Sequence, residues 1–197
     1  MTMELLRIFG YFASPGDSHL AEFLPYYLRS KESMERYGLK QRDNRDSRKR
    51  KGEALKRCGD IVRGKVELPP ARESGERAMQ IIRSTILDLG QVHYANIPNR
   101  GYISNLPDEI VVEVPTKFGK GGYKGVGVGP LPLGIKALMT PVIETQELGV
   151  EASIRGDRDL ALQAFLCDPI VNDATVAGKV LDEMLRKSKD FVPQFRR

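Results

Sequence analysis

The succession of helical and strand patterns between residues 74 and 114 constrains the fold most. Apolar residues recur at spacings of three and four in its first part, at Met79, Ile82, Ile86 and Leu89. This period predicts a core helix that begins at Ser74 and ends at Gly90. Short runs with strand character follow at 92–97, 102–106 and 110–114. The last run is almost wholly apolar, so we expect burial on both of its faces.

Helical patterns cover most of the remaining chain, at residues 1–9, 30–64, 140–155, 157–168 and 173–185. Thr140-Pro141 predicts a helix start, because proline is favoured at the first helical position. Gly156-Asp157 should end that helix and cap the next one, and Asp173 should cap the last. Long helices around a small set of antiparallel-type strands indicate the α+β class.

Residues 119–129 contain six glycines and could be mistaken for a dinucleotide-binding loop. That motif needs a strand directly before the glycines and a helix directly after them. Pro130 and Pro132 follow here and disfavour an ordinary helix start. The sequence therefore predicts a flexible connection and not a nucleotide loop.

Composition narrows the class of protein further. Hydrophobic residues make up 41% and charged residues 29% of the 197 residues, as in soluble globular proteins. No apolar run approaches the ~20 residues that span a bilayer, and no signal-peptide pattern opens the chain. Cys58 and Cys167 stand outside any Cys-x-x-Cys pair, which favours a reducing compartment. We expect a cytoplasmic protein that does not enter a membrane.

The net charge of +5 is unevenly placed, with thirteen lysines and arginines between residues 29 and 63. Such a run is usually a solvated helix face or a loop. Nucleic-acid binding is the alternative, but aromatic residues that could stack on bases do not alternate with the charges.

The segment 10–27 gathers polar side chains beside an apolar-aromatic run. Pro15-Gly16 makes a turn, after which Asp17 is placed to cap a helix that begins at Ser18. From the residues alone, Asp17 can be an N-cap or a functional carboxylate. His19 can likewise be a surface histidine or part of a site.

Several motifs occur in one order along the chain: Gly10-Tyr11-Phe12, Asp17 to Pro25, Ser74 to Ala78, Asn96 to Pro107, Val111 to Pro115, Gly129 to Pro132, Glu147 to Ala152 and Ala161 to Pro169. In this order they resemble the C-terminal half of glycoside hydrolase family 4, on the side of its α-galactosidases, α-glucosidases and α-galacturonidases. The resemblance implies an α+β fold like the C-terminal domain of lactate dehydrogenase, with long helices packed on a small, mostly antiparallel sheet. It also implies that residues 1–197 form one domain, and that the family's N-terminal Rossmann domain lies outside them.

The resemblance further implies an NAD- and Mn²⁺-dependent α-glycosidase that cleaves O-glycosidic bonds by oxidation, elimination, addition and reduction. The family thereby departs from two-carboxylate glycoside hydrolysis. The cofactor sites would belong to the missing half, so the chain should be inactive alone. Asp17 matches the base that removes the C2 proton. Ser18 and His19 would line the sugar site, and Asn96, Asn99 and Arg100 are candidates for substrate or subunit contacts. A homo-oligomer is expected, and a non-catalytic assembly or binding module is the alternative function.

Overall fold

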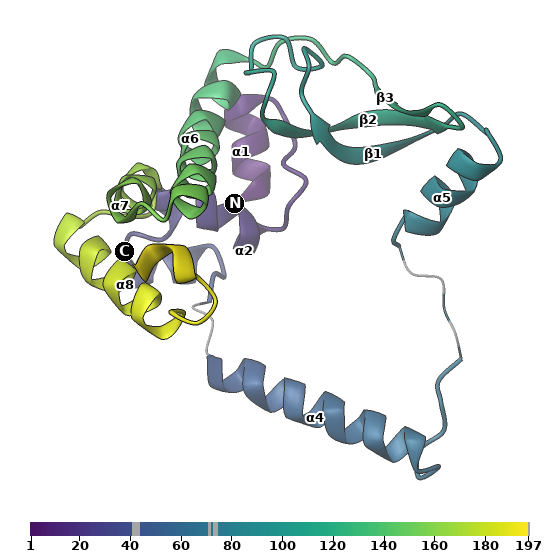
Figure 1. Ribbon diagram of the computed structural model, residues 1–197, viewed down its shortest axis with the longest axis horizontal. Helices are drawn as coiled ribbons and strands as arrows, with labels where there is room; N and C mark the ends of the chain where they lie inside the picture. Colours follow the sequence, from purple (N-terminus) through teal and green to yellow (C-terminus); the bar gives the residue numbers. More distant parts are fainter. Residues whose placement is uncertain (41–43, 71, 73–74, 197) are drawn as a thin grey trace.

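The computed structural model describes residues 1–40, 44–70, 72 and 75–196, and combines many helices with one small sheet (Figure 1). Its α-helices are α1 (Thr2–Phe9), α2 (Asp17–Leu20), α3 (Lys31–Arg36), α4 (Asn44–Val62), α5 (Ala78–Ile86), α6 (Leu133–Arg155), α7 (Arg158–Cys167) and α8 (Ala174–Lys187). Short 3₁₀ helices are η1 (Ala21–Phe23), η2 (Pro25–Tyr27) and η3 (Pro193–Arg196). The strands are β1 (Gln91–Pro98), β2 (Val111–Gly119) and β3 (Gly122–Gly125). The predicted α+β class is confirmed.

The sheet is antiparallel throughout, in the order β1-β2-β3. Along β2 the side chains alternate, because Val112 and Val114 are 6% and 1% exposed whereas Val111 is 64% exposed. The expectation that residues 110–114 are buried on both faces of the strand was therefore wrong. An antiparallel sheet can leave one face to solvent, and here only one face lies against a core.

Two other expectations around the sheet were also wrong. Residues 102–106 form turns and not a strand, as part of a loop that joins β1 to β2. The glycine-rich stretch is not merely a connection, since Gly122–Gly125 forms β3 and pairs with β2. Gly122 permits this hairpin because its φ of +102° lies in a region that side chains disfavour.

Gly125 is a position where a side chain would collide with the core. A Cβ atom there would lie 2.6 Å from Cε2 of the Tyr102 ring, which the 99–110 loop places against the strand. We expect Gly125→Ala to destabilise the protein by about 1–3 kcal/mol through overpacking. Gly121→Ala is the matched control, because no heavy atom lies within 4 Å of a Cβ built there. Urea unfolding followed by circular dichroism measures both, and equal midpoints for the two variants would contradict the packing argument.

Helix α6 begins at Leu133, two turns before the predicted start, and Pro141 lies inside it. The local signal of Thr140-Pro141 was therefore misleading. The predicted end is confirmed, since Gly156 takes the left-handed conformation with φ of 68°. Both predicted caps are also confirmed. The Asp157 side chain accepts from the backbone nitrogens of two residues in α7, and that of Asp173 accepts from Val176 in α8.

The buried apolar residues form two clusters. The sheet cluster comprises Ile97, Ile103, Leu106, Ile110, Val112 and Val114. The N-terminal cluster comprises Leu5, Ala21, Leu24, Tyr27 and Leu39. Helix α6 packs on both, through Ile143 on the sheet cluster and Leu138 on the N-terminal cluster. It also lies beside α1 (Figure 1), where a Cβ on Gly134 would meet the Phe9 ring at 3.3 Å.

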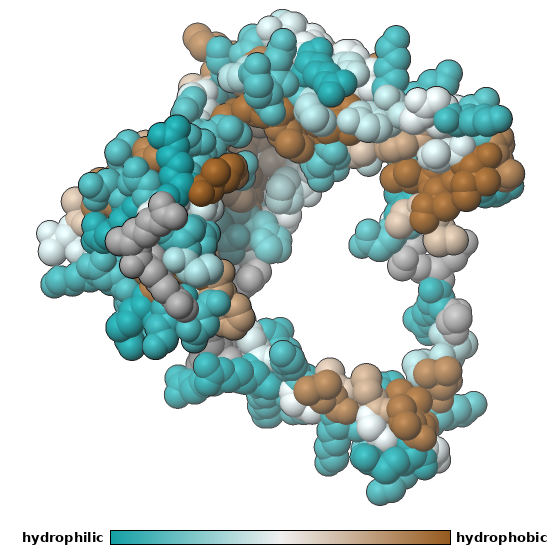
Figure 2. Space-filling model, in the orientation of Figure 1, coloured by the Kyte–Doolittle hydropathy of each residue, from teal (hydrophilic) through white to brown (hydrophobic). Residues whose placement is uncertain are grey.

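Helix α5 was predicted to lie in the core, and this was wrong. Met79 and Ile86 are each 72% exposed and Ile82 is 48% exposed, and Figure 2 shows hydrophobic side chains gathered over this helix. The helix instead contacts the sheet through Ser84, whose hydroxyl donates to the Phe118 carbonyl at 2.8 Å. The predicted start at Ser74 lies outside the described residues. The helix that the structure describes begins at Ala78.

The polar segment 30–64, predicted to be helical, contains the two helices α3 and α4. Helix α4 lies apart from the rest of the molecule in Figure 1 and carries much of the basic run. Nucleic-acid binding by this run stays a prediction, and Arg42 lies outside the described residues. Among the helices of the described residues, none has the length and apolar character needed to cross a membrane.

Candidate functional site

The Asp17 carboxylate does not cap the helix in which it lies. The N-cap of α2 is Gly16, and no side chain accepts a hydrogen bond there. Asp17 Oδ1 instead accepts from the backbone nitrogen of Thr2 at 2.9 Å and from the Thr2 hydroxyl. The predicted local cap was wrong because the first turn of α1 offers unsatisfied N–H groups, and α2 folds back to meet them.

These hydrogen bonds fix the charge and the orientation of Asp17. The Thr2 hydroxyl, and then the Thr2 backbone N–H, hold the pKa of Asp17 below its usual value. Both donate to Oδ1, whereas Oδ2 has a longer contact of 3.4 Å with the amino group of Met1. The side chain is 39% exposed. Asp17 therefore presents an ionised carboxylate in one orientation, with Oδ1 held by Thr2 and Oδ2 in a longer contact with the Met1 amino group.

Ser18 and His19 follow Asp17 on the same helical turn and are both exposed. The His19 side chain is 62% exposed, and its Nδ1 lies 3.4 Å from Oε2 of Glu22. The structure thus brings the first three predicted site residues together at one accessible edge, at the lower end of α1 in Figure 1.

The other three candidates lie with the sheet, away from α2 (Figure 1). Asn96 is exposed on β1, and Arg100 is exposed in the following turn with φ of 43°. Asn99 is 0% exposed. Its amide nitrogen donates to the carbonyls of Ile103, Leu106 and Pro107 at 2.9–3.0 Å, and its Oδ1 accepts from the Ile103 nitrogen. The structure therefore gives Asn99 the role of holding the 99–110 loop and leaves its side chain inaccessible to a substrate.

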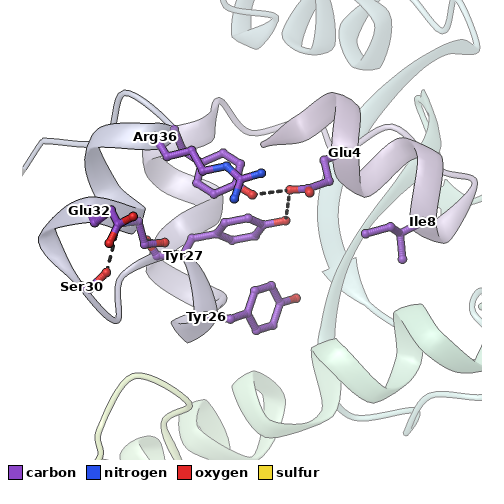
Figure 3. A pocket seen from close by; sticks show the side chains of 9 residues that line it. Glu4, Ile8, Tyr26, Tyr27, Ser30, Glu32 and Arg36 are labelled. Atoms are coloured by element: carbon purple, nitrogen blue, oxygen red, sulfur yellow. Dashed lines mark hydrogen bonds between the residues drawn. The ribbon is translucent and has the colours of Figure 1, made fainter.

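A cluster that the sequence did not reveal surrounds Glu4. Glu4 Oε2 accepts from the Tyr37 hydroxyl at 2.8 Å and from the Tyr27 hydroxyl at 3.3 Å (Figure 3). The two tyrosine rings meet edge to face, with centroids 4.8 Å apart. The members come from α1, η2 and the residue that follows α3, so no local spacing could have indicated them.

The cluster shifts the pKa of each of its members. The Tyr37 hydroxyl holds the pKa of Glu4 below its usual value. Burial, and then the Glu4 charge, raise the pKa of Tyr27 to about 12. The hydrogen bond to Glu4 raises the pKa of Tyr37. At neutral pH the cluster consists of an ionised carboxylate and protonated phenols.

These shifts predict how stability depends on pH. Because the Glu4 pKa is lowered on folding, its contribution is present above the ordinary value of 4.5 and is lost as pH falls further. Because the Tyr27 pKa is raised from 10.0 to about 12, its contribution is present below pH 10 and is lost as pH rises towards 12. We expect Tyr27→Phe to flatten the alkaline limb and Glu4→Gln to flatten the acid limb of the free energy of unfolding, measured in urea. Tyr94→Phe, at a 70% exposed position, should leave both limbs unchanged.

Among the described residues, no group of three or more His, Cys, Asp or Glu residues lies close enough to hold a metal ion. Gly119–Gly129 contributes to a β-hairpin and an extended run before α6, and not to a strand-loop-helix turn.

The fold and the site geometry can be compared with known proteins. Residues 1–171 match the family model described as the family 4 glycosyl hydrolase C-terminal domain. The chain belongs to this family. The α-galacturonidase of Thermoanaerobacter italicus is 30% identical over 196 residues, which cover 96% of the chain and 42% of the relative. The chain thus spans less than half the length of this relative.

Solved structures in the family share the fold. The Bacillus subtilis protein lplD superposes with a TM-score of 0.82 at 30% identity, over 93% of the chain and 42% of that protein. A 6-phospho-α-glucosidase from gut microorganisms, solved in complex with NAD and Mn²⁺, superposes with a TM-score of 0.77 at 20% identity, over 98% of the chain and 43% of that protein. The expected lactate dehydrogenase C-terminal-domain-like arrangement is thereby confirmed.

Proposed function

We propose that this chain is the C-terminal, substrate-side domain of an NAD- and Mn²⁺-dependent α-glycosidase. The observation that carries the proposal is the match of residues 1–171 to a C-terminal-domain model of family 4, and the chain covers 42% of the Thermoanaerobacter italicus α-galacturonidase. The reaction is hydrolysis of an O-glycosidic bond through oxidation, elimination, addition and reduction. The cofactors bind mainly to an N-terminal Rossmann domain beyond residues 1–197, and the chain is inactive without it. The complete enzyme is cytoplasmic.

Within this proposal Asp17 removes the proton from C2 of the sugar. Two observations support that role: the side chain is partly exposed, and Thr2 holds only Oδ1, whereas Oδ2 has the longer 3.4 Å contact with the Met1 amino group. A base needs an oxygen that can come within hydrogen-bond reach of the proton it takes, and Oδ2 is the less firmly held of the two. Ser18 and His19 lie beside Asp17 and line the sugar, whereas Asn96 and Arg100 offer exposed contacts on the sheet side.

Reconstitution tests the proposed activity. The N-terminal portion of the Thermoanaerobacter italicus α-galacturonidase that this chain does not match is produced separately and mixed with the 197-residue chain. With NAD and Mn²⁺ present, we expect nitrophenol release from a nitrophenyl α-glycoside only when both parts are present. The intact Thermoanaerobacter italicus α-galacturonidase serves as the positive control. Release by the chain alone without NAD would overturn the proposal, as would an inactive fusion of the two parts that is shown to be folded.

A specific observation favours assembly as a second role. The apolar face of α5 is exposed, and a helix with such a stripe normally buries it. We propose that this face is covered in a homo-oligomer. Sedimentation should show self-association of the chain, and Ile86→Lys should weaken it. Lys187→Glu, at the far end of the chain, is the charge-changing control. A stable monomer at micromolar concentration would contradict this role.

A further inference from the structure

An open hollow of about 590 Å³ lies on the surface of α6, and we call it the α6 hollow. It is lined by Gln146, Gly149, Val150, Ser153 and Ile154. Val150 is 56% exposed and Ile154 is 73% exposed. The Ser153 hydroxyl already donates to the Gly149 carbonyl at 2.7 Å. Apart from Gln146 at one end, the hollow therefore presents apolar groups, which suit the apolar side chains of a partner better than a polar ligand.

One edge of the α6 hollow is acidic. Glu147 precedes Val150 by three positions and Ile154 by seven, so the three side chains lie along one face of the helix. Glu147 is exposed, and no basic side chain among the described residues pairs with it. The next acid, Glu151, is already paired with Arg155. A partner that covers Val150 and Ile154 therefore meets an uncompensated negative charge at the Glu147 end of this line.

Helix α4 carries the complementary pattern. It lies apart from the rest of the molecule in Figure 1, and Figure 2 shows hydrophobic side chains exposed along it. Leu55 is 64% exposed and Val62 is 87% exposed, and Cys58 between them is exposed as well. Lys51 begins this line, because positions 51, 55, 58 and 62 share one helical face. Most helical stability in proteins comes from the packing of one face, so α4 would gain from a partner.

The line on α4 matches the line on α6 in length and in charge. Lys51 and Cys58 are seven positions apart, as are Glu147 and Ile154, and seven residues extend about 10 Å along a helix. If the two helices run parallel, Lys51 meets Glu147 and Cys58 meets Ile154. Helix α4 as a whole carries seven lysines and arginines against three acids, so attraction to the acidic edge also acts before contact.

We infer that the face of α4 from Lys51 to Val62 docks in the α6 hollow of a second copy of this chain, with the two helices parallel. A second copy is the partner because both complementary surfaces belong to this chain but lie apart within it (Figure 1). In a two-fold dimer each copy gives its α4 and receives that of its partner, so the contact forms twice and closes. The inference names a surface other than the α5 face and rests on the proposed homo-oligomer.

Thiol crosslinking tests the contact and its direction. Cys167→Ser leaves Cys58 as the one native thiol of the 197-residue chain, and a short bismaleimide is added at a concentration where sedimentation shows self-association. Ile154→Cys should give about fivefold more covalent dimer than Gln146→Cys, which lies about 12 Å away along the same helix. Adding Cys58→Ser should abolish this difference. Preferential linkage of Gln146→Cys, or a link within one chain, would overturn the inference.

A charge exchange provides a second measurement that needs no introduced cysteine. Glu147→Lys should raise the dissociation constant of the dimer about fivefold, because a repulsion replaces an attraction at the contact. Lys51→Glu in the same chain should restore the constant to within about twofold of the wild type. Glu144→Lys is the control, since it makes the same charge change at an exposed position outside the line and should have a smaller effect. Failure of Lys51→Glu to restore the dimer would count against the contact.

The two measurements separate this inference from the wider proposals. A chain that sediments as a stable monomer would overturn the homo-oligomer and this contact together. A chain that self-associates, with equal linkage of Ile154→Cys and Gln146→Cys, would overturn the contact alone. Loss of the link in the fusion with the N-terminal portion would assign the α6 hollow to that portion and would also overturn the inference. None of these readouts depends on glycosidase activity.

Discussion

Asn99→Ala is expected to destabilise the protein by about 4 kcal/mol, because it leaves several buried backbone groups without partners. The Asn99 side chain is fully buried and makes four hydrogen bonds with the backbone of the 99–110 loop. That loop carries Ile103 and Leu106 into the sheet cluster. The substitution should therefore loosen the core as well as the turn. Urea unfolding measures the loss, and hydrogen exchange of the amides in 99–110 locates it.

Asn96→Ala is the matched control, because Asn96 is exposed on the same strand and should change stability by less than about 0.5 kcal/mol. Asn99→Asp keeps the size of the side chain but removes the amide donors that reach three carbonyls. It should destabilise at least as strongly as alanine. If Asn99→Asp were as stable as the wild type, the hydrogen-bond explanation would fail.

Asp17→Asn is expected to lower the activity of the reconstituted enzyme by about 10²- to 10⁴-fold, the usual contribution of a positioned base. The amide keeps the size of the side chain and an oxygen for Thr2, so folding should be little affected. The loss should fall mainly on kcat. This prediction depends on the proposed function and is measured with the two-part enzyme described above.

Glu22→Gln is the control, because it removes a nearby exposed carboxylate that contacts only His19 among the described residues. It should retain activity within about threefold. Thr2→Val tests Thr2 as a positioning residue. It removes the hydroxyl that most lowers the pKa of Asp17, so the acid limb of the pH–rate profile should move to higher pH. Unchanged activity in Asp17→Asn would remove Asp17 from the mechanism.

The sequence could predict those features whose cause lies within a few residues. The caps at Asp157 and Asp173 and the helix end at Gly156 depend on hydrogen bonds or dihedral angles of the local backbone. The family could also be inferred, because its motifs keep their order along the chain. Pro141 shows the limit of local signals, since tertiary packing keeps it inside a helix that it would otherwise begin.

Features that depend on partners far along the chain could not be predicted. Asp17 was expected to cap its own helix, but its hydrogen-bond donors belong to Thr2, 15 residues earlier. The Glu4 cluster joins residues up to 33 positions apart. The apolar period of α5 indicates correctly that one face suits burial, yet it says nothing of what covers that face. The described residues leave Met79 and Ile86 exposed.

Helix α6 also bears on the order in which parts of the molecule unfold. It contacts the N-terminal cluster through Leu138 and the sheet cluster through Ile143, and Pro141 lies between these two contacts. Proline has no N–H, so the Ala137 carbonyl lacks its helical donor at this point. We therefore expect the two clusters to behave as separate foldons, joined through a helix that lacks one hydrogen bond at their junction. Native-state exchange should therefore open one of them while the other stays protected.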